Sequence, residues 1–289
     1  MLRMLLKPLR FLALLILALA AQYAMAAPFA LVTILQGDAM LLREEGKFQL
    51  AEGVALKPED IVELSTKAML LRIEYADGSS LVLGPASRVL IAPSKVTGDR
   101  AKTRAYVMAG WAKLSLAPGS EGTLASALAD LTGTGARAVL GLSPGRAQVF
   151  AEGGEWKLRH AGGTIPMKTG DFVTVPSAGK PETAGRPSAE FMQFLPRPFM
   201  DTLPSRAQLF AGKEVPPKSI GVISYVDARD WLTVPEPALR RAELPRWRLL
   251  SRDAEFRKAL IENLSSHPEW DGVLFPSSIP SAARAASKP

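Results

Sequence analysis

The fold is decided by residues 70–83, which read Leu-Leu-Arg-Ile-Glu-Tyr-Ala-Asp-Gly-Ser-Ser-Leu-Val-Leu. Arg72 and Glu74 alternate with large apolar residues, the period-two pattern of a half-buried strand. Asp77-Gly78 then supplies turn residues. A three-residue loop over 76–78 places every large apolar side chain on one face. If the two strands are direct neighbours, this loop predicts a positive φ at Gly78 and the pairs Tyr75–Ser79, Ile73–Leu81 and Leu71–Leu83.

The same pattern of short apolar runs and turn residues continues from residue 29 to residue 175. Short runs of Val, Leu and Ile are separated at close intervals by Gly, Pro, Asp and Ser. This pattern predicts a mainly β domain over residues 27–175, either a sandwich or a short β-roll. Thr123–Leu131 is the one stretch in this region that reads as a helical turn or two.

The β region contains an internal repeat of about residues 37–64 and 145–175. The two stretches match at one constant offset, and after a three-residue slip residues 56–62 match residues 167–173. The constant offset favours a duplication over the general similarity of β-meanders. The first seven matches are Gly37/Gly145, Ala39/Ala147, Leu41/Val149, Glu44/Glu152, Gly46/Gly154, Phe48/Trp156 and Leu50/Leu158.

The first repeat and the hairpin together resemble the FecR domain, over about residues 32–116. The resemblance is carried by the strand that follows Glu59-Asp60, the Asp-Gly-Ser turn at 77–79, the Pro-Ala-Ser corner at 85–87 and Gly110-Trp111. Glu59 departs from the family's Gly-Asp pair, whereas the second repeat keeps Gly-Asp. The resemblance implies an all-β periplasmic interaction domain with no established enzyme activity. Its structural turn motif would comprise Asp60, Asp77, Gly78, Ser79, Gly110 and Asp171.

The first 26 residues read as an export signal. Three cations precede an apolar run over residues 11–21, and Ala24-Met25-Ala26 follows as a small-x-small cleavage site. The run is shorter than the roughly 20 residues that cross a bilayer. We expect cleavage after Ala26 and a periplasmic mature protein without a membrane span. A retained short anchor is the alternative.

The remaining chain divides by composition into three parts. Residues 176–222 form a Pro-rich linker that we expect to be partly docked, with preferred protease sites that release a β fragment ending near Val175. Residues 223–280 read as a small helical module, with Phe256, Leu260 and Leu264 recurring every four residues. Residues 281–289 are expected to be a disordered tail.

The composition leaves little room for catalysis. The net charge is +7, with no Cys and two His, which excludes disulfides and thiolate sites. His160 and His267 have no neighbouring ligand set. Gly-Leu-Ser-Pro-Gly over 141–145 resembles a nucleophile elbow, but Pro144 lacks the N–H that an oxyanion hole needs. We therefore read it as a turn, and likewise the glycine pattern at 133–138. The acidic pairs Glu44-Glu45 and Glu59-Asp60 are expected in turns or in solvent.

A basic stretch lies in the helical module. It is either a surface for anionic envelope material or a solvated helix face whose arginines cover tryptophans, and we favour the latter. Its cations are Arg240, Arg241, Arg246, Arg248, Arg252, Arg257 and Lys258.

The sequence thus predicts a non-catalytic periplasmic protein that binds an envelope protein or glycan, without cofactor, metal or nucleic acid. The alternatives are an envelope signalling regulator that acts on a membrane receptor or an anti-sigma system, and a serine hydrolase that would use Ser143.

Overall fold

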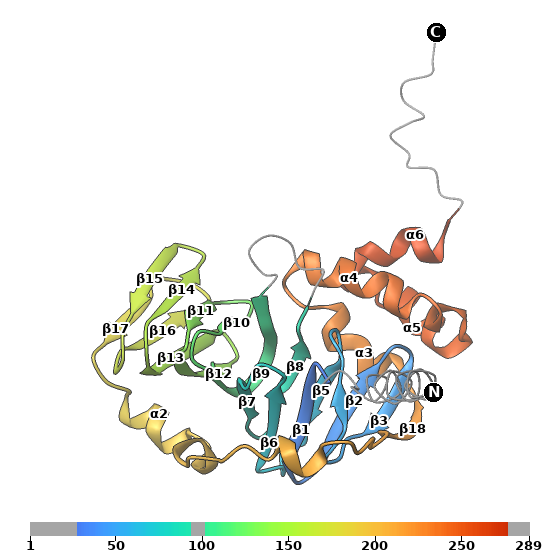
Figure 1. Ribbon diagram of the computed structural model, residues 1–289. Coiled ribbons are helices and arrows are strands. Elements are labelled where there is room, and N and C mark those ends of the chain that lie inside the picture. Colours follow the sequence, from blue (N-terminus) through green and yellow to red (C-terminus); the bar gives the residue numbers. More distant parts are fainter. Residues whose placement is uncertain (1–27, 94–101, 277–289) are drawn as a thin grey trace, which may run out of the picture.

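The computed structural model describes residues 28–93 and 102–276, apart from the side chains of residues 242–244. The predicted export signal and the predicted tail lie outside the described residues. The fold is mainly β, a curled and almost wholly antiparallel strand system with short helices towards the C-terminus (Figure 1).

The strands form two sheets that share one long strand, β9 (Thr103–Ser115). Its N-terminal part pairs in sheet B and its C-terminal part in sheet A. Every pairing of named strands is antiparallel except β9 with β10. Across sheet A the order is β4 (Ala55–Leu56), β1 (Ala30–Gln36), β6 (Leu70–Tyr75), β7 (Ser80–Leu83), β9, β12 (Arg137–Ser143), β13 (Arg146–Gly153), β16 (Phe172–Pro176) and β17 (Glu182–Ala184). Across sheet B it is β18 (Lys218–Val222), β3 (Gly46–Gln49), β2 (Ala39–Arg43), β5 (Ile61–Leu64), β8 (Arg88–Ile91), β9, β10 (Glu121–Ala125), β11 (Asp130–Thr134), β14 (Trp156–His160) and β15 (Gly163–Met167).

The turn and the strand pairing predicted for residues 70–83 are confirmed, but the prediction of a half-buried strand with every large apolar side chain on one face is wrong, because Leu70 and Val82 are buried in a second cluster on the opposite face. β6 and β7 pair Ile73 with Leu81, the Tyr75 N–H donates to the Ser79 carbonyl at 2.8 Å, and φ at Gly78 is +83°. The apolar face of the hairpin is buried in the main core, which both sheets supply. Leu71, Ile73, Leu81 and Leu83 are all completely buried there.

Replacing Gly78 with Val should lower the free energy of unfolding by about 1–3 kcal/mol, because a β-branched residue is strained at positive φ. A Cβ at this position would contact only the Cβ of Ala117, at 3.7 Å. The loss therefore reports backbone strain without a steric clash. Urea unfolding of the two proteins measures it, and an unchanged midpoint would contradict the turn geometry.

The two repeats share their strand register although they lie in different sheets. β2 and β5 pair in sheet B, and β13 and β16 pair in sheet A. The turn before each second strand is also the same, since the N–H of Lys57 donates to Asp60 and that of Lys168 to Asp171, both at 2.8 Å. The matched pairs are Ala39–Leu64 with Ala147–Val175, Leu41–Val62 with Val149–Val173, and Leu42–Ile61 with Phe150–Phe172.

The helical reading of Thr123–Leu131 is wrong, because this stretch forms the β10–β11 hairpin. The Ser126 hydroxyl both accepts from the Ala129 N–H at 3.1 Å and donates to the Ala129 carbonyl at 2.8 Å. The hydroxyls of Thr123 and Thr132 face each other across the strands at 2.8 Å. Side-chain hydrogen bonds of this kind compete with a helix and favour the turn.

The C-terminal helices cover the outer face of sheet B and share a core with it. Leu42, Ile61 and Leu90 of the sheet belong to the same buried cluster as Trp231 and Trp247. Asp253 caps the helix that carries Phe256 and Leu260, since its side chain accepts the Phe256 N–H. The helices are α3 (Tyr225–Leu232), α4 (Pro237–Trp247), η4 (Leu250–Arg252), α5 (Ala254–Glu262), η5 (Leu264–Ser266), η6 (Pro268–Trp270) and α6 (Asp271–Leu274).

An ion pair joins these helices to the sheet and should make their docking sensitive to acid. Lys47 donates to Asp227 at 2.6 Å, and Asp227 also closes the capping box of α3 with Ser224. Burial raises the pKa of Asp227, but the hydrogen bonds from Lys47 and Ser224 outweigh it and hold this pKa below its ordinary value. A depressed carboxyl pKa stabilises the fold above about pH 4, and the stabilisation is lost as the pH falls through the folded-state value.

Asp227→Asn should therefore lower the free energy of unfolding by about 1–2 kcal/mol at pH 7, which is the range for partly exposed charge-assisted hydrogen bonds. The variant should also lose less stability than the native protein between pH 6 and pH 3. Urea unfolding at several pH values tests both effects. Parallel pH profiles for the two proteins would contradict this role of Asp227.

A crossing segment, residues 186–217, covers the outer face of sheet A. Figure 1 shows it running beneath the strands from β17 to β18. Phe191 and Phe199 are buried against Ile34, Val82 and Phe172 of the sheet. Phe194 and Met200 point outward, with 64% and 67% of their surface exposed. The segment carries α2 (Ala189–Phe194), η2 (Arg197–Met200) and η3 (Ala207–Phe210).

Candidate functional site

The structural turn motif lies at turns and corners, and it does not converge on one site. Asp60 is 2% exposed and accepts both Nε and Nη2 of Arg43, at 2.8 and 2.6 Å. Asp60 therefore lies in a turn, one of the two placements expected for the acidic pairs, and it is buried there rather than solvated. Glu59 has φ +71° where the second repeat has Gly170 at +95°. The non-glycine residue thus takes the backbone conformation that its glycine counterpart adopts freely.

Asp171 lies in the turn before β16, and the remaining motif residues hold the β6–β7 turn and the bend of β9. Asp77 accepts the Ser79 N–H at 3.0 Å and also contacts Arg104, and the buried Ser79 hydroxyl accepts the Ala117 N–H at 3.0 Å. Gly110 lies where β9 leaves sheet B for sheet A. These contacts are internal, so the geometry gives these residues a structural role.

The basic stretch divides into internal and exposed cations. Arg240 donates to Glu269 at 2.8 Å, Arg246 donates to the Leu42 carbonyl at 2.8 Å, and Arg257 donates to the Leu274 carbonyl at 2.6 Å. The Arg246 guanidinium also lies over the Trp247 ring, 5.4 Å from its centroid. These three side chains hold the helices in place. The exposed cations are Arg241, Arg248, Arg252 and Lys258.

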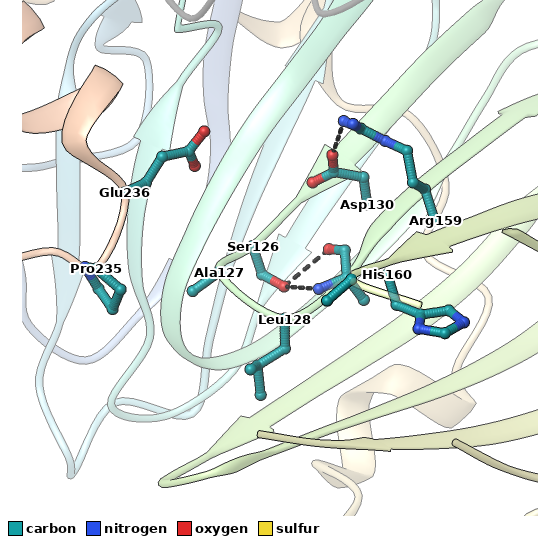
Figure 2. Close-up of a pocket in the computed structure, with 10 residues that line it drawn as sticks. Ser126, Ala127, Leu128, Asp130, Arg159, His160, Pro235 and Glu236 are labelled. Atoms are coloured by element: carbon teal, nitrogen blue, oxygen red, sulfur yellow. Dashed lines mark hydrogen bonds and ion pairs between the residues drawn. The ribbon is translucent and has the colours of Figure 1, made fainter. Parts of the chain in front are cut away.

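A cavity of about 320 Å³ lies between the β10–β11 turn, the β14–β15 turn and the start of α4. It brings Ser126, Asp130 and His160 into one neighbourhood (Figure 2). Ser126 is engaged with the backbone of Ala129, and Figure 2 shows the His160 ring directed away from it. Asp130 pairs with Arg159. This geometry provides no nucleophile–base contact.

The remaining sequence candidates for catalysis are also structural. Ser143 pairs with Arg146 across the β12–β13 turn, and φ at Gly145 is +73°. A strand follows this turn, where a nucleophile elbow would require a helix. His267 is fully buried with its Nε2 3.1 Å from the Tyr225 hydroxyl, and burial lowers its pKa. The described ranges contain no group of three or more potential metal ligands.

Buried charges on sheet A fasten the crossing segment, and the sequence did not predict this. Arg72 donates to the Pro204 carbonyl at 2.9 Å, and Lys113 donates to the Phe199 carbonyl. Glu74 accepts the Arg206 N–H at 2.9 Å and the Ser205 hydroxyl. Burial lowers the pKa of the Arg72 guanidinium, whereas the hydrogen bonds to Glu74 overcome burial and lower the pKa of that carboxyl.

The apolar groove, our name for a hollow of about 740 Å³, lies where the crossing segment meets the β4 edge of sheet A. One wall comes from the start of β1, from β4 and from the β6–β7 turn, and the other comes from residues 205–217. Most of its lining residues are apolar. Its larger apolar side chains are Leu31, Tyr75, Phe210, Val215, Pro216 and Pro217, and its ionisable side chains, besides Tyr75, are Arg43, Lys57, Glu74, Lys213 and Glu214.

An exposed strand continues from this groove. β18 begins directly after Pro217 and pairs only with β3 among the described strands, so it is an edge of sheet B. Ile220 and Val222 of β18 are 50% and 68% exposed, and Val226 at the start of α3 is 72% exposed. Exposed apolar residues beside an open strand edge are typical of surfaces that bind another chain.

Comparison with known proteins assigns no family. No family model matches the sequence, and no curated protein matches it. The chain is similar to two crystal structures of a protein from Parabacteroides distasonis that is provisionally assigned as an anti-sigma factor, at 13% and 12% identity and a TM-score of 0.39 in both cases. The match covers 47% of this chain but only 64% and 63% of the neighbours, less than two thirds of their length.

The resemblance to the FecR domain therefore remains a prediction from the sequence. No described helix is long and apolar enough to cross a membrane.

Proposed function

We propose that this protein is a non-catalytic interaction protein of the bacterial periplasm that binds an extended apolar segment of another envelope protein in the apolar groove. The observation that supports it most is the groove itself, which is preformed and has mainly apolar walls. Its volume of about 740 Å³ is within the range of roughly 300–1,000 Å³ for pockets that bind compact ligands.

The lining favours a peptide over a glycan. Tyr75 is 4% exposed and its hydroxyl donates to the Arg104 carbonyl at 3.0 Å, so its ring face is not presented to a sugar. The walls also include strand β4 and residues 213–217, whose Val215 forms a bridge to Val54. Extended peptides bind such sites with alternate side chains in the apolar hollow.

The test is crosslinking and pull-down of the mature protein, residues 27–289, from periplasmic and envelope fractions. Ala211 lines the groove and is exposed, so Ala211→Arg should obstruct the groove without disturbing the core. Ala178 is exposed in the β16–β17 turn, and Ala178→Arg is the matched control. A photoreactive residue at position 211 should crosslink to one segment of one protein.

We expect specific capture by the native protein and the control, and about tenfold less capture by Ala211→Arg, as for loss of a buried anchor contact. Equal capture by all three proteins, or groove-dependent capture of a glycan, would overturn the proposal. If the crosslinked partner is a membrane receptor or a membrane-bound regulator, the protein is an envelope signalling regulator of the kind that the sequence offers as an alternative.

A further inference from the structure

Three arginines line one groove at the junction of α4, η4, α5 and α6. This arginine groove has a volume of about 770 Å³. Half of its lining residues are arginines, and none is acidic. The lining residues are Arg248, Leu249, Ser251, Arg252, Arg257 and Val273.

Two of these arginines are available to a ligand, and the third is fixed in position. Arg248 and Arg252 are exposed, and their side chains have no hydrogen bond or ion pair within the described part of the chain. Arg257 is half-buried, and its Nη2 donates to the Leu274 carbonyl at 2.6 Å. The Ser251 hydroxyl donates to the Arg248 carbonyl at 2.7 Å, which holds the backbone of this turn.

The acidic residues nearby are engaged elsewhere or lie outside the groove lining. Asp253 caps α5 by accepting the Phe256 N–H at 2.9 Å. Glu262 lies 3.9 Å from Lys258, and Glu269 pairs with Arg240 at 2.8 Å. Glu255 and Asp271 are exposed and do not contribute to the lining. No carboxylate therefore belongs to the lining of the arginine groove, which carries three positively charged side chains.

We propose that the arginine groove binds a phosphate group of an anionic ligand. The guanidinium is planar and always charged, and its parallel N–H donors match the oxygens of phosphate in a bidentate arrangement. Two exposed guanidiniums beside one fixed guanidinium can contact several phosphate oxygens at once. Leu249 is 52% exposed in the same lining and offers an apolar contact beside the phosphate.

This site is separate from the apolar groove and does not depend on the proposed function. The two grooves have no lining residue in common. Ala211→Arg should therefore leave phosphate binding unchanged, and loss of the arginines should leave capture of the protein partner unchanged.

The test is calorimetric titration of the mature protein with inorganic pyrophosphate at low ionic strength. The double variant Arg248→Gln/Arg252→Gln removes the two exposed guanidiniums of the groove. The control, Arg241→Gln/Lys258→Gln, removes two other exposed cations of the same basic stretch and changes the net charge equally. Thermal unfolding confirms that both variants fold, as their surface positions lead us to expect.

We expect affinity for pyrophosphate to fall about tenfold or more in the groove variant and to change less than about twofold in the control, because bidentate contacts are lost only in the former. Equal losses in both variants, or no binding by the native protein, would overturn the proposal. Vesicles of phosphatidylglycerol distinguish the source of the phosphate. Groove-dependent vesicle binding identifies a lipid headgroup, and groove-dependent binding of pyrophosphate alone identifies a soluble phosphate ester.

Discussion

Trp231→Ala should lower the free energy of unfolding by about 3–5 kcal/mol, the range for removing a buried tryptophan. Trp231 is 1% exposed and belongs to the cluster that α3 and its neighbours share with sheet B. Its indole N–H donates to the Glu63 carboxylate at 2.8 Å. The substitution therefore leaves a cavity and removes a donor from a largely buried acid.

Glu63 adds an electrostatic cost to the cavity. Burial raises the pKa of the Glu63 carboxyl, and the hydrogen bond from Trp231 opposes that rise. Without the indole, the nearest cation is Arg88, whose Nε lies 4.0 Å away. Trp231→Phe keeps most of the apolar contact and should cost only about 1–3 kcal/mol, the penalty for one unsatisfied buried partner.

Urea unfolding followed by circular dichroism measures both variants. Because the helices and sheet B share one buried cluster, we expect a single transition in which strands and helices unfold together. A loss below about 1 kcal/mol in Trp231→Ala, or two transitions of which only the helical one shifts, would show that the helices contribute little to the sheet.

Local patterns were enough to predict the β architecture. In residues 70–83 the alternation and the turn pair specify which side chains enter the main core, and the observed pairing Ile73–Leu81 follows directly. The N-cap at Asp253 is a feature of the same local kind, because it depends on residues within one helical turn. These features depend on interactions between residues that are close in the sequence.

The grooves and the buried charges could not be predicted in this way. Arg72 and Glu74 read as the solvent face of a strand, yet each is 7% exposed because residues 203–206 cover them. That contact joins residues about 130 positions apart, and no local periodicity encodes it. Contacts between distant residues also decide which cations of the basic stretch are internal and which are exposed. Arg246, for example, donates to the Leu42 carbonyl, which is far away in the sequence.

Gly110→Ala should lower the free energy of unfolding by about 2–5 kcal/mol, the sum of backbone strain and overpacking. Gly110 has φ +85° at the point where β9 passes from one sheet to the other. A Cβ there would lie 2.5 Å from the Ser87 Cα and 2.6 Å from its Oγ. Ser87 is fully buried, and its hydroxyl bridges the N–H and the carbonyl of Trp111 at 2.9 and 2.8 Å. The neighbour can therefore move only by breaking the contacts that fix the bend.

Gly119→Ala is the matched control, because it separates the two causes. Gly119 also has a positive φ, +78°, but a Cβ at this position would meet nothing within 4 Å. Gly119→Ala should therefore lower the free energy of unfolding by only about 1–2 kcal/mol, which is the strain of an L-residue in the left-handed region. Urea unfolding of both variants gives the difference, which isolates the clash with Ser87. Equal losses at the two positions would mean that β9 can shift away from Ser87, and that Gly110 is needed for its backbone conformation alone.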